Sequence, residues 1–151
     1  MAIKRLISVC TRADGYTFEV ASSYIQSYIS AKQYVVFVPE ADLDFFSSLN
    51  LGSYEVKNEE KYRDIADLLK RRELGQRFGW YFQQFIKMAE LENGDDDDLN
   101  LIWDADTIPL RSMNFTFNDK VFFYQGREFH RPYFRLIKGT SEEPAASGVM
   151  C

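Results

Sequence analysis

Residues 99–106 read Leu-Asn-Leu-Ile-Trp-Asp-Ala-Asp, a largely apolar stretch that ends at two acidic side chains. Residues 99–103 are typical of a buried β-strand, and Asp104-Ala105-Asp106 follows at its carboxyl end. Side chains two residues apart on a strand point the same way, so we expect the carboxylates of Asp104 and Asp106 to share one side. Two neighbouring carboxylates repel each other unless a cation lies between them.

Mg²⁺ and Mn²⁺ prefer oxygen ligands of this kind and usually share them with the phosphates of a substrate. We therefore predict a Mn²⁺ or Mg²⁺ site at Asp104 and Asp106, where the cation could stabilise charge on a departing diphosphate. The alternative is a solvated turn in which both aspartates are ordinary loop residues.

Two further apolar runs precede this strand, Ile3–Cys10 and Tyr34–Val38, and both are predicted to be buried strands. Apolar residues recur at helical spacing between them and after them. The predicted helices cover residues 15–29, 43–49, 60–73 and 80–91, and further short strands are expected at 54–57 and 121–124. Strands that alternate with helices predict an α/β fold with an open, mostly parallel, Rossmann-like sheet and flanking helices.

The chain has 151 residues, which suggests one domain, and a formal net charge of -5, which argues against a nucleic-acid partner. It contains no apolar run that approaches the roughly 18 residues of a membrane span, and no signal peptide is recognisable. Cys10 is expected to be a buried thiol in a reducing compartment. We therefore expect a soluble, cytoplasmic domain without a membrane span.

The carboxyl ends of the predicted strands carry polar residues that should converge. Ligands of open α/β sheets bind beyond these ends. The first strand is followed by Thr11 and Arg12, and the second is followed by Pro39-Glu40. The strand at 99–103 is followed by Asp104-Ala105-Asp106. Three distant segments of the chain are thus predicted to meet at one edge of the sheet.

The segment 101–110, Leu-Ile-Trp-Asp-Ala-Asp-Thr-Ile-Pro-Leu, resembles the strand and Asp-x-Asp segment of GT-A glycosyltransferases. The preceding Gly-Trp-Tyr-x-Gln-Gln-x-x-Lys pattern at 79–87 is similar to a family of bacterial glycosyltransferase-like proteins linked to surface polysaccharide. Residues 130–134, His-Arg-Pro-Tyr-Phe, fit the same pattern loosely.

This resemblance implies a GT-A-like fold and a metal-assisted transfer of a sugar from a nucleotide-sugar donor to a glycan or other acceptor. It implies that Asp104 and Asp106 contact the metal, ribose or diphosphate, and that Thr11 and Arg12 lie near the nucleotide. The helix after Gly79 would flank the donor pocket and supply further contacts, namely Trp80, Gln83, Gln84 and Lys87. Without the resemblance, Trp80 would be interpreted as a core residue, and the polar residues would be interpreted as an ordinary solvent-exposed helix face.

Members of the family that this sequence resembles continue well beyond the position equivalent to Tyr133. We therefore expect a nucleotide-sugar-binding domain over residues 1–138, with 139–151 as a tail or the start of an acceptor-side region. His130 could join the metal site, as a later histidine does in several GT-A enzymes, or be an ordinary surface or core residue. No catalytic residue can be named from the sequence.

Two other functions fit parts of the pattern. One is a binding module that holds a nucleotide sugar without turnover. The other is a phosphohydrolase of the haloacid-dehalogenase type, with Asp104 as nucleophile and Asp106 as acid/base. Against the latter, Ile108 stands where that class has Thr or Val, and only 45 residues follow Asp106 to supply its remaining groups.

Overall fold

The computed structural model describes residues 2–72, 74–92, 99–118, 120–122, 125–126 and 149–150. The chain forms two compact units, residues 1–114 and residues 115–151. The division falls between Asn114 and Phe115. Each unit is considered by itself below.

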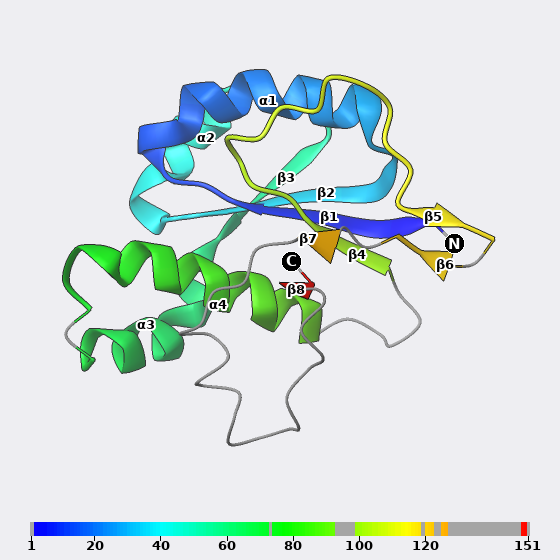
Figure 1. The fold of residues 1–151 in the computed structure, drawn as a ribbon. Helices are drawn as coiled ribbons and strands as arrows, with labels where there is room; N and C mark the ends of the chain where they lie inside the picture. Colours follow the sequence, from blue (N-terminus) through cyan, green and yellow to red (C-terminus); the bar gives the residue numbers. More distant parts are fainter. Residues whose placement is uncertain are drawn as a thin grey trace, which may run out of the picture. The chain divides into compact units, whose positions relative to one another are not determined.

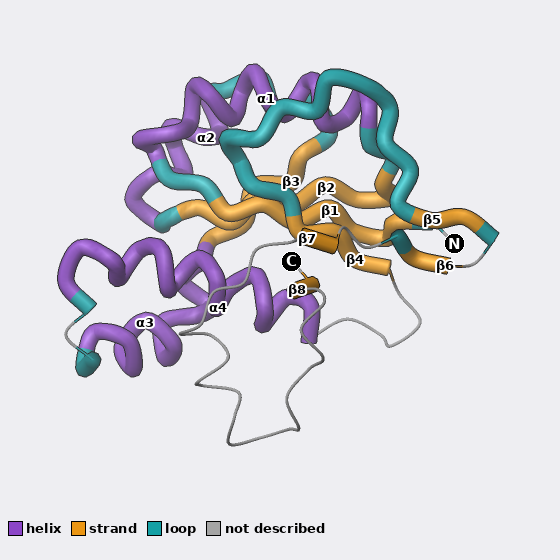
Figure 2. The backbone as a smooth tube through the Cα atoms, in the orientation of Figure 1, coloured by secondary structure: helices purple, strands orange, loops and turns teal. Residues whose placement is uncertain are grey.

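The first unit is built on a four-stranded parallel sheet (Figures 1 and 2). Its strands are β1 (Ile3–Val9), β2 (Ala31–Val38), β3 (Tyr54–Asn58) and β4 (Leu99–Ile102), in the order β3-β2-β1-β4. All three strand pairs are parallel, and Ile7 of β1 faces Val35 on one side and Ile102 on the other. The predicted open, parallel α/β sheet is confirmed, and it is consistent with a Rossmann-like fold.

Helices cover both faces of the sheet. α1 (Gly15–Tyr28) and α2 (Leu43–Ser48) lie on one face, and α3 (Arg63–Lys70) and α4 (Phe78–Glu92) lie on the other (Figure 1). Short 3-10 turns precede these four helices, at Arg12–Asp14, Glu40–Asp42, Glu59–Tyr62 and Gly75–Arg77. Asp14 is the N-cap residue of α1, but its side chain makes no capping hydrogen bond.

The alternation of strand side chains divides the core into two layers. Ile7, Val9, Val35 and Phe37 form a buried cluster with residues of the α3 and α4 layer, namely Tyr62, Ala66, Leu69, Phe82 and Ile86. The opposite layer contains Phe18 of α1, which is fully buried and meets the Tyr54 ring edge-on with ring centroids 5.0 Å apart. Burial on both faces explains why β1 and β2 read as continuous apolar runs.

After β4 the chain returns to the α1 side, where the N–H of Met113 donates to the carbonyl of Tyr28 at 3.0 Å. In the second unit, β5 (Thr116–Phe117) pairs antiparallel with β6 (Lys120–Val121), and β7 (Gln125–Gly126) pairs antiparallel with β8 (Val149–Met150).

The structure therefore differs from the strand predicted at 121–124. Val121 closes a two-residue antiparallel strand, and residues 123–124 lie outside the described residues. The acidic run 95–98, His130 with its neighbours, and most of the 139–151 segment also lie outside the described residues. Within the part that the structure describes, no helix has the length and apolar character needed to cross a membrane.

Candidate functional site at the ends of β1 and β4

The sheet has a topological switch point between β1 and β4. From β1 the chain moves outward through β2 to β3 and then returns to add β4 on the other side of β1. Ligands of open α/β folds bind outside the carboxyl ends of the strands at such a point. A cavity of about 230 Å³ lies there, lined by Val9, Asp14, Trp80, Gln83, Gln84, Lys87, Asp104, Ala105 and Asp106.

The two aspartates reach this cavity from a turn. β4 ends at Ile102, and the Trp103 N–H donates to the carbonyl of Ile7 at 3.0 Å. The N–H of Thr107 then donates to the carbonyl of Asp104 at 3.1 Å, which closes a turn over residues 104–107. Both carboxylates line the cavity as predicted, but strand alternation is the wrong reason, because neither residue is extended within β4.

α4 supplies the opposite wall. Trp80, Gln83, Gln84 and Lys87 follow one another at helical spacing and form one face, whereas Phe82 and Ile86 turn toward the core. The side chain of Trp80 is 57% exposed, so the core-packing alternative for this residue is wrong. Its indole ring meets the Tyr81 ring edge-on at 5.0 Å.

Lys87 and Asp104 join the two walls. The Lys87 ammonium lies 2.6 Å from Oδ1 of Asp104, and Lys87 is only 7% exposed. A buried ammonium requires a charged or hydrogen-bonding partner, and Asp104 supplies it from the turn. The Asp104 side chain is 64% exposed, so this carboxylate still faces the open side of the cavity.

Three carboxylates, those of Asp14, Asp104 and Asp106, line the cavity against the single ammonium of Lys87. Burial, followed by the charge of Asp14, raises the pKa of Cys10 to about 12, and Asp106 adds to the effect. The predicted buried thiol is confirmed. Cys10 does not line the cavity, and its protonated thiol is not a nucleophile, so the chemistry of the cavity rests on carboxylates, amides and the ammonium.

A divalent cation fits this donor set in part. No group of three or more histidine, cysteine, aspartate or glutamate side chains that could hold a metal ion is found among the described residues. Mg²⁺ commonly takes only one or two protein carboxylates and completes its shell with water and substrate phosphates. Asp104 and Asp106 could therefore hold the cation together with a phosphate-bearing ligand, with Asp14 beside them.

Thr11 and Arg12 are at the carboxyl end of β1, but neither lines the cavity. The Arg12 guanidinium lies 4.8 Å from the centre of the Phe45 ring, and its main-chain N–H donates to Asp42 at 3.0 Å. Arg12 thus interacts with the α2 side of the sheet. Asp14 lines the cavity but was not predicted as a site residue, although it follows the same strand end.

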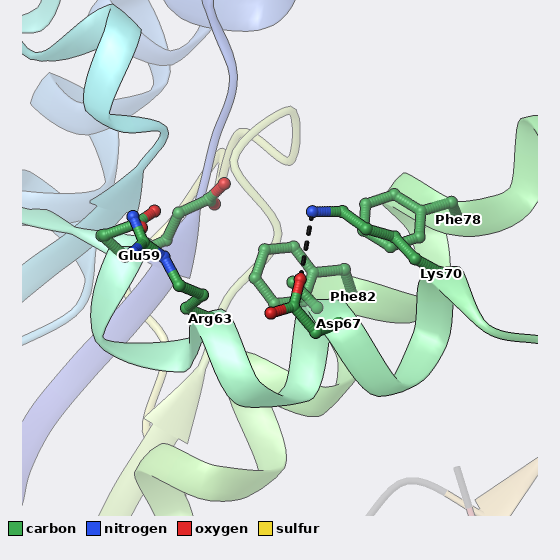
Figure 3. A pocket seen from close by; sticks show the side chains of 8 residues that line it. Glu59, Arg63, Asp67, Lys70, Phe78 and Phe82 are labelled. Carbon is green, nitrogen blue, oxygen red and sulfur yellow. Dashed lines mark hydrogen bonds and ion pairs between the residues drawn. The ribbon is translucent and has the colours of Figure 1, made fainter.

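A larger cavity of about 430 Å³ lies between α3 and α4 (Figure 3). The rings of Phe78 and Phe82 stack beside it, with centroids 5.7 Å apart. Lys70 is paired with Asp67 at 3.3 Å, and Arg63 is paired with Glu60. We do not assign the site to this cavity, because its cations are occupied by neighbouring acids and it includes none of the residues at the switch point.

The cavity at the switch point combines hydrogen-bond donors, acidic side chains and one exposed aromatic face. Gln83, Gln84 and Lys87 can donate to phosphate oxygens, and the indole of Trp80 can cover a flat ring or an apolar sugar face. This arrangement suits a ligand with phosphate groups and a flat or ring-shaped part. Comparison of the chain with protein-family models, curated proteins and solved structures gives no match.

Proposed function

We propose that this chain binds a nucleotide sugar and is the donor-binding part of a GT-A-type glycosyltransferase assisted by Mn²⁺ or Mg²⁺. The main support is that six of the eight residues expected to bind the donor line one cavity, namely Trp80, Gln83, Gln84, Lys87, Asp104 and Asp106. Its place at the switch point of the sheet, where α/β proteins bind nucleotides, is independent support.

The charge of the cavity explains why a cation is needed. Asp14, Asp104 and Asp106 carry three negative charges and Lys87 carries one positive charge, which leaves a net formal charge of about -2. A diphosphate alone would be repelled, so its binding should depend on a divalent cation held by Asp104 and Asp106. When bound, such a cation stabilises the negative charge that develops on a departing diphosphate.

The remaining side chains would orient the donor. The amides of Gln83 and Gln84 donate hydrogen bonds to sugar hydroxyls or phosphate oxygens, and the Trp80 ring covers the flat base or one face of the sugar. The acceptor would be a glycan, as in the assembly of a surface polysaccharide. The catalytic base stays unassigned.

A phosphohydrolase is the second candidate, and one contact favours it. That chemistry needs a lysine beside the nucleophilic aspartate, and Lys87 takes this place at Asp104 although it precedes the aspartate in the chain. Asp104 would attack phosphorus, the ester P–O bond would break, and Asp106 would protonate the departing alcohol. A covalent phosphate on Asp104 would be the signature of this reaction.

Calorimetric titration with UDP- and GDP-sugars, with and without Mn²⁺, tests the proposal. We expect binding that requires Mn²⁺ and that weakens by about tenfold or more in Asp106→Asn, because one cation ligand is lost. Asp44→Asn, at an exposed position on α2, is the matched control and should bind like the wild type.

Each alternative has its own outcome. Hydrolysis of a simple phosphate ester with phosphate trapped on Asp104 would replace the proposal by the phosphohydrolase. Donor binding with neither sugar transfer nor donor hydrolysis, measured on the full gene product with a panel of glycan acceptors, would identify a binding module.

A further inference from the structure

The contact between Lys87 and Asp104 sets a condition on cation binding. The Lys87 ammonium donates a hydrogen bond to Oδ1 of Asp104. In the proposed function, the same carboxylate is a ligand of the divalent cation. An ammonium and a divalent cation that share one carboxylate repel each other, so both cannot hold Asp104 at full strength.

Lys87 lies where its ammonium could also meet a ligand bound in the same cavity. It lines the cavity together with Gln83 and Gln84 of the same helix face, and its side chain is 9% exposed. If Asp104 turned to a cation, a bound phosphate could supply a compensating negative charge for the ammonium. A lysine ammonium on a flexible stem can make this change by rotation of its side chain.

We propose that Lys87 is the resident counter-ion of Asp104 and that Asp104 exchanges it for the divalent cation, so that the ammonium is released to the phosphates of the ligand. This inference rests on the proposed function, since it assumes cation binding at Asp104. Lys87 is then a positioning residue with two opposite effects. It weakens cation binding in the absence of phosphate and strengthens phosphate binding in the presence of the cation.

The test measures these two effects separately in the full chain. Free Mn²⁺ is counted by electron paramagnetic resonance during titration of the wild type and of Lys87→Met, which keeps an unbranched side chain suited to a helix. Without phosphate, the variant should bind Mn²⁺ about fivefold more tightly, because a competing charge is gone. With Mn²⁺ present, its affinity for pyrophosphate should fall by a similar factor or more.

Two further variants separate a charge effect from a packing effect. Lys87→Arg retains a cation and should keep a Mn²⁺ affinity close to that of the wild type. Lys70→Met also removes a lysine ammonium, but Lys70 pairs with Asp67 on α3 and does not line this cavity, so the Mn²⁺ affinity of this variant should be unchanged. Thermal unfolding of all variants verifies that each is folded.

Equal or weaker Mn²⁺ binding by folded Lys87→Met would overturn the exchange and would leave the proposed function intact. Absence of Mn²⁺ binding by the wild type and by Lys87→Met would overturn both, because no cation would then compete for Asp104. The two failures are therefore distinguishable.

Discussion

The hydroxyl of Ser8 donates a hydrogen bond to the carbonyl oxygen of Trp103, 2.9 Å away, and so ties β1 to the residue that precedes Asp104. Ser8 is fully buried in the middle of the sheet. A polar side chain at such a position is stable because its hydrogen bond is satisfied. The turn that carries the two aspartates is thereby fixed to the central strand.

Replacement of Ser8 by alanine should lower the free energy of unfolding by about 1–2 kcal/mol, because a buried hydrogen bond is lost. Urea denaturation measures the change. Ser23→Ala is a matched control, because the Ser23 hydroxyl also donates to a carbonyl, that of Val20, but at an exposed position. This control should stay within about 0.5 kcal/mol of the wild type. An equal loss of unfolding free energy in both variants would show that the buried Ser8 hydrogen bond contributes no more than the exposed one of Ser23.

Glu90 links α4 to the sheet. Its carboxylate is 4% exposed and accepts from the Arg5 guanidinium at 2.8 Å, and it also pairs with Lys61 and with the Tyr62 hydroxyl. Burial opposes its ionisation, but the Lys61 and Tyr62 hydrogen bonds and the charges of Lys61 and Arg5 outweigh burial and hold the pKa of Glu90 below its ordinary value.

We expect Glu90→Gln to cost about 3 kcal/mol of stability, because it breaks a buried ion pair and leaves Arg5 without its acid partner. Chemical denaturation near pH 7 measures this cost. Glu92→Gln, at an exposed position of the same helix, should be close to neutral. Since the pKa of Glu90 is lowered on folding, its contribution is present above the ordinary pKa and is lost as the pH falls through the folded value. A pH-independent difference between Glu90→Gln and the wild type would contradict this explanation.

Glu59 should show the opposite pH dependence. Burial, followed by the charge of Asp42, raises the pKa of Glu59 from 4.5 to about 6. The stability linked to its proton is therefore present below pH 4.5 and is lost as the pH rises through about 6. Glu59→Gln cannot ionise, so it should match the wild type near pH 4 and exceed it by about 1 kcal/mol near pH 8, after allowance for solvent screening.

Denaturant unfolding at the two pH values checks the Glu59 prediction. Glu40→Gln, at an exposed position before α2, serves as control and should change stability by the same small amount at both values. A constant difference for Glu59→Gln as well would mean that Glu59 ionises alike in the folded and unfolded chain.

The two tryptophans offer an optical test of the cavity. Trp80 is 57% exposed, whereas Trp103 is half-buried and its indole N–H donates to the carbonyl of Thr107 at 2.8 Å. Acrylamide should quench Trp80 strongly, so Trp80→Phe should remove most of the quenchable fluorescence. Mg²⁺ together with a nucleotide sugar should protect the wild type from quenching. Unchanged quenching on saturation with that ligand would place it away from Trp80.

The strands and helices of the first unit could be predicted because their apolar side chains recur with the period of each element. Deviations occur where polar residues interrupt that period. β2 begins at Ala31 instead of Tyr34, since pairing with β1 extends the strand through the exposed Lys32 and Gln33. α3 begins at Arg63 instead of Glu60, because residues 59–62 form a 3-10 turn whose Asn58 side chain accepts from the Glu60 N–H.

The site could be predicted in composition but not in its internal contacts. The spacing of residues on α4 placed Gln83, Gln84 and Lys87 on one face, and the structure confirms it. The partner of Lys87 is 17 residues away at Asp104 and is set by how α4 packs against β1 and β4. The contact of Arg12 could not be predicted for the same reason, since the Phe45 ring beside it belongs to a helix more than thirty residues later in the chain.

Paramagnetic broadening by Mn²⁺ in an ¹H-¹⁵N NMR spectrum, recorded with UDP present, locates the cation directly. The amide signals of Ala105 and Asp106, and those of Gln84 and Lys87 across the cavity, should broaden first. Asp106→Asn should require about tenfold more Mn²⁺, or more, for the same broadening. Broadening centred on Glu60 and Asp67, in the cavity between α3 and α4, or broadening without any preferred site, would contradict a cation-assisted phosphate site at the ends of β1 and β4.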